Sequence, residues 1–480
     1  MAKKYVGREE ETKQIEQYLL TERSELIALY GRYRVGKTYL VRCTINKLID
    51  FEFTGMYKAS GMAQRAQFQK EINRRTGQEK EGAQDWFDAF DRLREYLLGL
   101  QKSRVVVFLD EIPWMDTGGA NFLAAFSRFW NEWGREDVML KLFVCGSATT
   151  WMLDKMIGDR GGLYGRITHS IYLSPLTLRE VEQYLNEMKK MKVDRKQVLD
   201  TYMIFGGIPF YLEMLDPLKP LSANIDALFF SDKAPLQAEY EFLFRSLFKN
   251  NEKYRRVVEL LSTKMKGLTR EEIIAGTKLE GGELTRILKN LTACDFIRTY
   301  REPGKKERGK IYQLTDMFCL FYIRFVQKRN DQDPHFWTNA KSLGETNAWS
   351  EYAFEQICLH HIPQIRRALG ISGVLSSFYA WSCRPFTDKD GNEWRGGQID
   401  LIIDRDDHVM NLCEMKYSDE EFVISKEDAK LLRERTQLFR RIQKTNKNLR
   451  CTFITPYGVK QNMHSGIVDH QLTLEDLFCE

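Results

Sequence analysis

Short apolar runs alternate with amphipathic stretches along residues 1–172. The runs read ELIALY, RVVVFLD, KLFVCGS and THSIYLSPL, at residues 25–30, 104–110, 141–147 and 168–176. Short strands separated by helical segments are typical of βαβ units, in which helices cover both faces of a parallel sheet. The pattern therefore predicts an α/β domain with a buried parallel sheet over residues 1–172.

Beyond residue 172 the pattern changes to helices and then to a mixture of helices and strands. Residues 173–245 are mostly helical, with LREVEQYLNEMKKM as the clearest amphipathic stretch. We expect a compact helical unit ending in a charged hairpin over 246–316, a helical connector over 317–345 and a mixed domain over 346–480. The length agrees with this division, because 480 residues correspond to roughly three domains of ~150 residues each.

The composition is that of an ordinary globular protein. Hydrophobic residues make up 43% and charged residues 29%, which excludes collagen-like and wholly disordered classes. The nine cysteines include no CxxC pair, and their odd number in a long chain indicates reduced thiols in a cytoplasmic protein. The start MAKKYVGREEE lacks the apolar core of a secretion signal, and the longest apolar runs fall short of the ~18 residues that span a bilayer. We therefore expect neither secretion nor membrane insertion.

One glycine-rich segment, GRYRVGKT at residues 31–38, fits the pattern GxxxxGK[ST] between a predicted strand and a predicted helix. Gly31 and Gly36 permit a tight turn, and the loop amides and the following helix N-terminus favour anionic phosphates. Lys37 is expected to reach the β- and γ-phosphates, and Thr38 to offer its hydroxyl to Mg²⁺. The sequence thus predicts that ATP and Mg²⁺ bind here. The predicted loop contacts are Gly31, Arg34, Val35, Gly36, Lys37, Thr38 and Tyr39.

A second acidic motif ends the apolar strand RVVVFLD. Asp110 and Glu111 follow each other at the carboxyl end of this strand, the edge at which ligands bind in open α/β sheets. We expect Asp110 to join the Mg²⁺ shell and Glu111 to orient or deprotonate the attacking water. The alternative is a strand that merely ends at a polar surface. It is less favoured, because the acidic motif occurs together with the loop at 31–38.

These residues resemble the AAA+ ATPases, in particular the archaeal and bacterial branch related to signalling (STAND-type) NTPases. The resemblance covers about residues 3–240 and extends to YVGREE at 5–10 and GGIP at 206–209. It implies a helical lid over 173–245, a sensor residue at the end of KLFVCGS, and an arginine finger, which would act between subunits only if the protein assembles into a homo-oligomer. The residues implied are Val6, Gly7 and Arg8 near the nucleotide, Ser147 as the sensor, Arg166 as the finger and Pro209 in the lid.

The positive charge of the chain is concentrated in residues 250–313. This stretch has 15 Lys and Arg against 9 Asp and Glu, whereas the whole chain has a net charge of only +5. Its order of helices and a hairpin resembles a winged helix-turn-helix domain. The resemblance implies a recognition helix beginning near Gly282 and presenting Thr285, Arg286, Lys289 and Asn290, with a wing that contacts phosphates through Lys305, Lys306, Arg308 and Lys310. DNA contact and a purely structural role as a joint between domains both remain open.

Two carboxylates and a lysine alternate along a predicted hairpin near the C-terminus. Residues 398–403 and 409–416 are expected to be antiparallel strands around a turn at DRDD. With a hairpin centred near residue 406, Asp400 and Glu414 are diagonal neighbours, and Lys416 shares their face because side chains alternate with period two. Hard carboxylate oxygens hold Mg²⁺, which can polarise a phosphodiester and acidify bound water. Residues 422–424 and 451–455 are expected to be further strands.

The spacing D-x₁₃-E-x-K after a glutamate-bearing helix resembles the PD-(D/E)xK nuclease superfamily over about residues 346–455. The resemblance implies a restriction-endonuclease-like α/β fold with Glu355 as the helix acid, Asp400 and Glu414 as metal ligands and Lys416 as the catalytic lysine. The leading Pro-Asp pair is absent, because Gln398 and Ile399 precede Asp400. Alternating polar residues that merely face water remain the other interpretation.

Two functions follow from these motifs. The first is an ATP-hydrolysing protein that binds nucleic acid, more readily DNA than RNA, through the winged helix and the C-terminal domain, and cleaves phosphodiesters with Mg²⁺. The second is a nucleotide-dependent switch, regulator or scaffold whose nuclease-like domain only binds. The first is favoured, because all four nuclease-like positions carry competent side chains.

Overall fold

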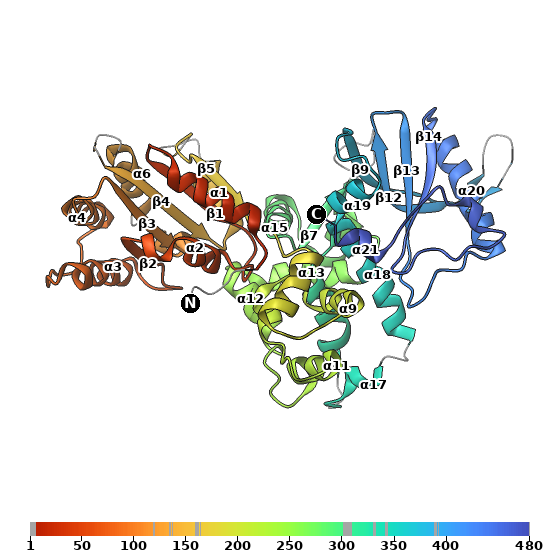
Figure 1. Cartoon of the computed structure of the whole chain (residues 1–480), viewed down its shortest axis with the longest axis horizontal. Coiled ribbons are helices and arrows are strands. Elements are labelled where there is room, and N and C mark those ends of the chain that lie inside the picture. Colours follow the sequence, from red (N-terminus) through yellow and green to blue (C-terminus); the bar gives the residue numbers. More distant parts are fainter. Residues whose placement is uncertain are drawn as a thin grey trace. The chain divides into compact units, whose positions relative to one another are not determined.

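The computed structural model describes residues 6–479 except 119–120, 134–135, 137, 159–162, 164, 301–309, 330–332, 341–343, 388–390 and 392. The chain forms two compact units, each made of more than one stretch of sequence. The colours of Figure 1 run along the sequence from the N-terminus to the C-terminus. The first unit comprises Met1–Leu176 with Ile208–Phe210 and Leu288–Cys294. The second unit comprises Thr177–Gly207, Tyr211–Ile287 and Asp295–Glu480.

The first unit is built on a five-stranded parallel sheet. Its strands are β1 (Glu25–Tyr30), β2 (Phe51–Thr54), β3 (Arg104–Asp110), β4 (Met139–Gly146) and β5 (His169–Tyr172), in the order β2-β3-β4-β1-β5. The central strands β1, β3 and β4 are almost wholly buried, which explains their continuous apolar sequences. The four predicted strands are present, and β2 is an additional edge strand.

Helices cover this sheet, as Figure 1 shows. They are α1 (Glu9–Leu20), α2 (Lys37–Ile45), α3 (Gly61–Thr76), α4 (Trp86–Gly99), α5 (Ile112–Met115), α6 (Phe122–Trp133) and α7 (Thr149–Trp151). An aromatic cluster fills the layer under α3, α4 and α6, where Trp86, Phe90 and Phe122 are buried in mutual ring contact. Such rings contribute a large apolar area each, so this layer anchors the helices on the sheet.

The second unit begins with a helical segment and continues into a small domain of helices and strands. The helical segment contains α8 (Leu178–Gln183), α9 (Arg195–Phe205), α10 (Pro209–Glu213), α11 (Leu221–Ile225) and α12 (Glu239–Leu247). The next elements are α13 (Asn251–Ser262), β6 (Leu268–Thr269), α14 (Arg270–Thr277), α15 (Gly281–Ala293), β7 (Ile297–Tyr300) and β8 (Ile311–Leu314). The start of α10, as far as Phe210, and the end of α15, from Leu288 on, belong to the first unit. The three strands form an antiparallel sheet in the order β6-β8-β7.

The C-terminal part of the second unit is a mixed sheet with helices. It begins with the helices α16 (Met317–Phe321), α17 (Phe336–Ala340), α18 (Gly344–His360) and α19 (Ile362–Ala368). The strands that follow are β9 (Ser376–Cys383), β10 (Phe386–Thr387), β11 (Glu393–Trp394), β12 (Gly397–Arg405) and β13 (Val409–Met415). The last elements are α20 (Lys426–Gln443), β14 (Asn448–Ile454), β15 (His470–Leu472) and α21 (Leu474–Leu477). The sheet order is β15-β14-β13-β12-β9, with β13, β14 and β15 parallel. The connection between the parallel strands β13 and β14 contains α20, whose Leu438 and Phe439 pack on the sheet.

Two details of this domain differ from the sequence expectation. The segment at 422–424 forms only an isolated bridge between Phe422 and Val459, so the strand predicted there is wrong. The strand β9, which the sequence did not predict, pairs with β12 across a bulge between Ile399 and Ile402. All nine cysteines are free thiols. Within the described part of the chain, no helix is both long and apolar enough to cross a membrane.

Candidate functional site

The loop at residues 31–38 has backbone conformations that require its glycines. Gly31 has φ 146°, and a Cβ at this position would lie 2.3 Å from the carbonyl oxygen of Leu173. Gly36 has φ 92° and caps the N-terminus of α2. Only glycine adopts both conformations without strain, so the loop can turn tightly from β1 into α2. The amides at the start of α2 thus face the loop, as in an anion-binding helix N-terminus.

Lys37 and Thr38 are held at this loop by hydrogen bonds. Lys37 is 4% exposed, and its ammonium donates to the carbonyl oxygens of Gly31 and Arg32 at 3.0 and 2.9 Å. The Thr38 hydroxyl donates to the two carboxylate oxygens of Asp110 at 3.1 and 3.0 Å. The structure therefore brings together the lysine, the hydroxyl and the first carboxylate that the sequence predicted.

Asp110 and Glu111 lie buried at the carboxyl end of β3, next to the end of β4. The hydroxyl and the backbone N–H of Ser147 both donate to the Glu111 carboxylate. Burial raises the pKa of Asp110, while the Thr38 hydroxyl opposes this shift. Burial also raises the pKa of Glu111, and the charge of Lys37 opposes it. A divalent cation would favour the ionised carboxylates, and the oxygen donors of Thr38 and Asp110 fit Mg²⁺.

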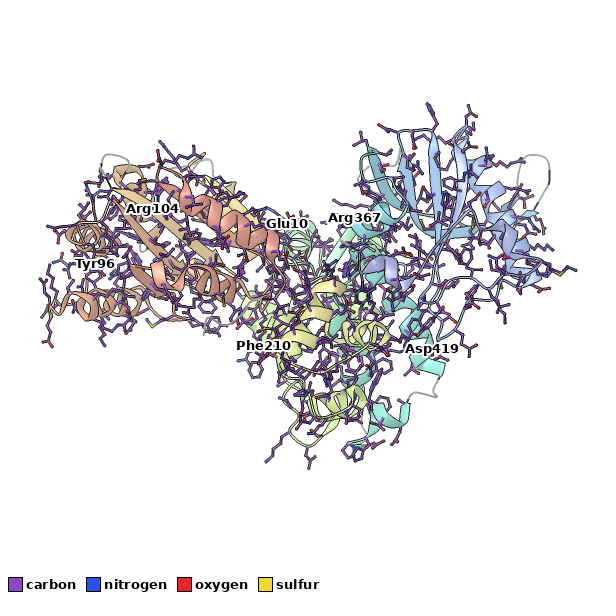
Figure 2. The ribbon with its side chains drawn as sticks, viewed as in Figure 1. Glu10, Tyr96, Arg104, Phe210, Arg367 and Asp419 are labelled. Carbon is purple, nitrogen blue, oxygen red and sulfur yellow. The ribbon has the colours of Figure 1, made fainter. Side chains whose placement is uncertain are left out.

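Further residues expected near the nucleotide occupy the first unit. Val6 and Arg8 are buried, Gly7 and Arg8 have positive φ, and the Arg8 guanidinium donates to the carbonyl oxygen of Ser174. The Arg34 guanidinium lies 3.7 Å from the centre of the Phe210 ring (labelled in Figure 2). This contact brings the loop to the segment that contains Pro209, whose Cγ would lie 3.9 Å from a Cβ on Gly36.

The remaining three residues differ in their surroundings. Val35 is fully buried and fixes the loop, whereas Tyr39 on α2 is partly exposed. Arg166 is exposed in a turn before β5, and its backbone N–H donates to the carbonyl oxygen of Leu163. The thiol of Cys145 on β4 bonds to Asp110. Sequence reasoning missed this contact, although the parallel pairing of β3 and β4 predicts adjacent strand ends.

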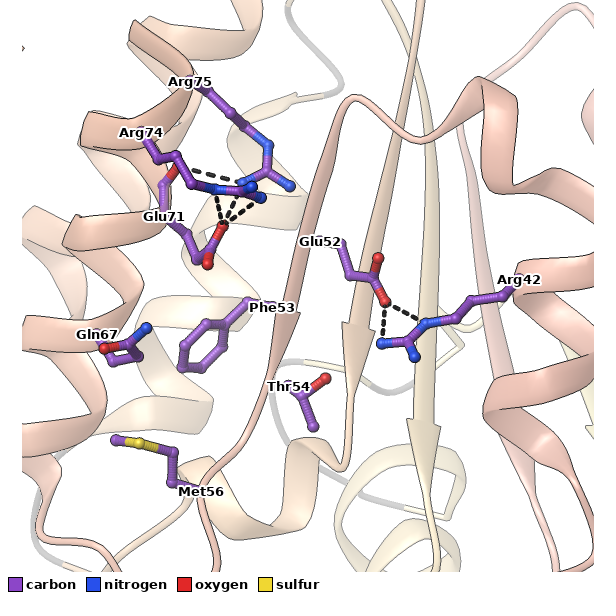
Figure 3. A pocket seen from close by; sticks show the side chains of 9 residues that line it. All are labelled: Arg42, Glu52, Phe53, Thr54, Met56, Gln67, Glu71, Arg74 and Arg75. Carbon is purple, nitrogen blue, oxygen red and sulfur yellow. Dashed lines mark hydrogen bonds and ion pairs between the residues drawn. The ribbon is translucent and has the colours of Figure 1, made fainter. Parts of the chain in front are cut away.

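A cavity of about 390 Å³ lies beside β2 at the edge of the same sheet (Figure 3). Arg42 forms an ion pair with Glu52, and Arg74 and Arg75 both pair with Glu71. Because its arginines are already paired, this cavity lacks the unpaired positive charge that a phosphate group would need. The loop at 31–38 is therefore the better nucleotide site.

The second group of predicted residues lies on β12, β13 and α18. In the observed hairpin Leu401 faces Cys413 and Ile402 faces Leu412, so the same register places Asp400 opposite Glu414. The predicted diagonal relation is wrong, because the hairpin centres on residue 407 instead of 406. The observed partner of Asp400 is thus two residues further along β13 than the predicted one. Because side chains alternate with period two, a difference of two residues leaves Asp400 and Glu414 on the same face of the sheet.

Burial and mutual repulsion govern the protonation of this cluster. Burial raises the pKa of Glu355 to about 8, and the neighbouring Asp400 carboxylate adds to the shift. Burial and the Glu414 carboxylate raise the pKa of Asp400. The Lys416 ammonium lies 3.3 Å from a Glu414 oxygen. Burial acts to lower its pKa, but Glu414 and the other acidic neighbours together outweigh burial and raise it. The four predicted residues thus lie within electrostatic range of one another.

Two residues that the sequence did not predict complete the cluster. The Arg435 guanidinium on α20 lies 2.8 Å from Glu414 and donates to the carbonyl oxygen of Gln398 at 2.7 Å. The side-chain amide of Gln398 donates to Asp400. Gln398 stands out in the sequence only as a departure from the Pro-Asp pattern, and Arg435 carries no signal because it comes from a helix 21 positions after Glu414. In the described residues no group of three or more His, Cys, Asp and Glu could hold a metal ion, so Asp400 and Glu414 would need waters or phosphate oxygens to complete a shell.

The predicted nucleic-acid contacts are only partly within the described residues. Thr285 and Arg286 on α15 are exposed, and Asn290 is half-buried. Lys289 is exposed too, but its ammonium forms an ion pair of 2.7 Å with Asp154. Lys305, Lys306 and Arg308 lie outside the described residues, whereas Lys310 lies at the base of the hairpin just before β8.

Residues 5–215 match the family described as an ATPase domain predominantly from Archaea. This stretch contains the loop at 31–38, the Asp110-Glu111 pair and Pro209. An uncharacterised protein of Methanocaldococcus jannaschii (MJECL04) is 23% identical over 427 residues, covering 86% of this chain and 88% of that protein. The chain contains a P-loop ATPase domain.

Two solved structures resemble parts of this chain at lower sequence identity than the Methanocaldococcus protein. The Walker-type ATPase PABY2304 of Pyrococcus abyssi is 19% identical, with a TM-score of 0.48 over 67% of this chain and 96% of that chain. The ORC2 protein of Aeropyrum pernix in its ADP form is 15% identical, with a TM-score of 0.38 over 66% of this chain and 91% of that chain.

Proposed function

We propose that this ATPase binds nucleic acid and that its C-terminal domain cleaves phosphodiester bonds with the help of Mg²⁺. The observation that carries the proposal is the convergence of Glu355, Asp400, Glu414 and Lys416 in one partly buried cluster, in which Asp400 lies opposite Glu414 and the Lys416 ammonium lies 3.3 Å from a Glu414 oxygen. Carboxylates whose protonation is favoured by burial and mutual repulsion are typical of sites that take up a cation. The fold around them, a mixed sheet with α18 and α20, supports the PD-(D/E)xK resemblance.

In the ATPase domain the chain supplies groups for each part of phosphate transfer. Lys37 and the amides of the loop at 31–38 would hold the phosphates, and Thr38 and Asp110 would hold Mg²⁺. Glu111 would orient or deprotonate the attacking water, with Ser147 fixing its carboxylate by two hydrogen bonds. Arg166 is exposed, which suits a finger that acts on the nucleotide of a second subunit.

In the C-terminal domain Asp400 and Glu414 would be the Mg²⁺ ligands. The ion would polarise the scissile phosphate and lower the pKa of bound water. The Lys416 ammonium would stabilise negative charge on the phosphate, and Glu355, in the ionised form that a bound cation favours, would accept a proton from water. Arg435 limits the mobility of the Glu414 carboxylate and neutralises part of its charge.

The order helix, strand, two helices and two strands over 251–314 supports a winged helix-turn-helix domain. Exposed Thr285 and Arg286 are available for nucleic acid, and the basic hairpin residues would contact phosphates. Charge reversal at Lys305 and Lys306 should weaken DNA binding and flatten its dependence on salt. Unchanged binding would move the interface elsewhere.

A nucleotide-dependent switch with a non-catalytic C-terminal domain is the second candidate. It is favoured by the ion pairs that Glu414 already makes with Lys416 and Arg435. In this case the cluster would stabilise the fold and would not turn over phosphodiesters.

Nicking of supercoiled DNA distinguishes the two candidates. The wild-type protein, Asp400→Ala, Lys416→Ala and the control Asp407→Ala are compared with Mg²⁺, with and without ATP. Asp407 is an exposed carboxylate in the same hairpin, so its loss removes a charge without touching the cluster. Nicking by the wild type and the control alone supports cleavage. Absence of nicking by the wild type under both conditions supports the switch.

A further inference from the structure

Tyr417 follows the predicted catalytic lysine directly and is bound by a helix from a distant part of the sequence. Its hydroxyl accepts a hydrogen bond from the Lys196 ammonium at 2.6 Å and donates to the Asp200 carboxylate at 3.2 Å. Lys196 and Asp200 belong to α9 and form an ion pair of 2.8 Å with each other. Lys196 also pairs with Asp419 at 3.2 Å (labelled in Figure 2). All four residues belong to the second unit.

The backbone around Lys416 has few other restraints. β13 ends at Met415, and the N–H of Lys416 makes the last ladder bond, to the carbonyl oxygen of Ile454 at 3.0 Å. Residues 416–421, all of them described, belong to no strand. The side chain of Tyr417 is therefore the anchor that follows this last bond. Burial raises the pKa of Tyr417, so its hydroxyl keeps the proton that it donates to Asp200.

The same tyrosine also touches the other catalytic element. Its ring lies 6.1 Å from the ring of Phe354, which precedes Glu355 on α18. Tyr417 is thus next in sequence to Lys416 and in ring contact with the neighbour of Glu355. A shift of the Tyr417 side chain would move both groups relative to Asp400, and placement errors of this kind are costly in catalysis.

From these contacts we propose that Tyr417, held by Lys196 and Asp200 of α9, is the positioning residue that fixes Lys416 in the C-terminal cluster. The proposal rests on the proposed cleavage function, but the ordering of residues 416–418 is a physical property that can be measured without cleavage. It makes α9 part of the C-terminal site, because α9 supplies two of the three groups in the hydrogen-bonded triad.

The test compares Tyr417→Phe and Lys196→Met with wild type. Tyr417→Phe removes only the hydroxyl and keeps the ring against Phe354, so folding should be retained. Tyr184→Phe is the matched control, because the Tyr184 hydroxyl bonds to a carboxylate, that of Glu213, in the same helical segment away from the cluster. Lys196→Arg keeps the positive charge, so it should retain part of the kcat and of the protection of the Lys416 amide that Lys196→Met loses.

Two readouts are combined. For DNA nicking we expect Tyr417→Phe to lower kcat by about 10–100-fold with little change in KM, the range seen when a supporting hydrogen bond behind an active-site group is lost. For hydrogen exchange we expect faster exchange of the Lys416 amide in Tyr417→Phe and Lys196→Met, with Tyr184→Phe unchanged. A merely structural role would lower the melting temperature without this local increase and without a selective effect on kcat.

The outcomes separate the two proposals. If wild type does not nick DNA, cleavage is refuted, and faster Lys416 exchange in Tyr417→Phe still supports positioning. If wild type nicks DNA and Tyr417→Phe retains both its kcat and its Lys416 exchange rate, positioning by Tyr417 is refuted while cleavage stands. Equal effects of Tyr184→Phe and Tyr417→Phe would also refute the proposal.

Discussion

The stability of the second unit should depend on pH through one buried histidine. His361 follows α18 and is 1% exposed. Its Nδ1 lies 2.7 Å from the carbonyl oxygen of Ile357, and its Nε2 accepts a hydrogen bond from the backbone N–H of Leu178 at 3.0 Å. The ring is therefore neutral, with the proton on Nδ1. The groups facing it are the Tyr202 ring on α9 and, at Coulombic range, Glu180 on α8.

Protonation of His361 would remove the acceptor of the first backbone N–H of α8, that of Leu178. Burial lowers the pKa of His361 from 6.5 to about 4. Between these values the unfolded chain binds the proton and the folded chain does not, so stability falls as the pH falls. The full difference of ~2.5 units corresponds to roughly 3 kcal/mol, of which about 2 kcal/mol is lost between pH 7 and pH 5. Above pH 6.5 the contribution is fully present.

The assay uses both histidine NMR and unfolding. In His361→Gln one Hε1 resonance should disappear, and in wild type that resonance should titrate near pH 4. Urea unfolding of the second unit should lose about 2 kcal/mol more in wild type than in His361→Gln between pH 7 and pH 5. The neighbouring His360 is exposed, so His360→Gln is the control and should keep the wild-type pH dependence. Titration of the assigned resonance near pH 6.5 would refute the reasoning.

Three further predictions concern nucleotide and nucleic-acid binding. Glu111→Gln should bind ATP like wild type but hydrolyse it at least ~100-fold more slowly, measured by phosphate release, because the water loses its base; wild-type turnover would contradict this role. Gly31→Ala should lose ATP binding in calorimetry, since its Cβ meets the Leu173 carbonyl at 2.3 Å, whereas Gly77→Ala, at a positive φ with open space around it, should bind normally. Arg433→Gln combined with Arg440→Gln removes two exposed charges from α20. If nucleic acid binds this helix, the slope of log affinity against log salt concentration should fall in magnitude by about 1.8. An unchanged slope would exclude α20 from the interface.

The conformation of the glycine-rich loop at 31–38 could be predicted from the sequence because its determinants are local. A glycine pattern between a strand and a helix specifies both the turn and the direction of the amides, and the buried apolar runs specify β1, β3 and β4. The edge strand β2 escaped prediction because FEFT has only four residues, which alternate between buried and exposed. Its apolar signal is too short to distinguish it from a loop.

The C-terminal cluster was predictable only in part. The period of two along β12 and β13 places Asp400 and Glu414 on one face, and this result survives the error in register because that error is even. The partners Gln398 and Arg435, and the contact between Lys196 and Tyr417, depend on tertiary packing over up to 221 positions. A single sequence contains no signal for such contacts.

The two carboxylate sites have a common electrostatic design. Asp110 and Glu111 face one lysine, Lys37, while Glu355, Asp400 and Glu414 face Lys416 and Arg435. Counting these side chains, each site has one more negative than positive charge when its carboxylates are ionised. Burial then acts against ionisation of the carboxylates, so each site is stabilised either by holding a proton or by binding a divalent cation.

The sites differ in how that cation would arrive. In the ATPase domain a bound nucleotide would carry its own Mg²⁺ and negative charge, and Lys37 lies at the loop proposed to receive the phosphates. In the C-terminal cluster Lys416 and Arg435 already neutralise Glu414, so a free cation must compete with two ion pairs. A phosphate group from a substrate would attract Lys416 away from Glu414 and free an oxygen for the metal. Cation and substrate should therefore bind to this cluster cooperatively, each increasing the affinity for the other by the same factor.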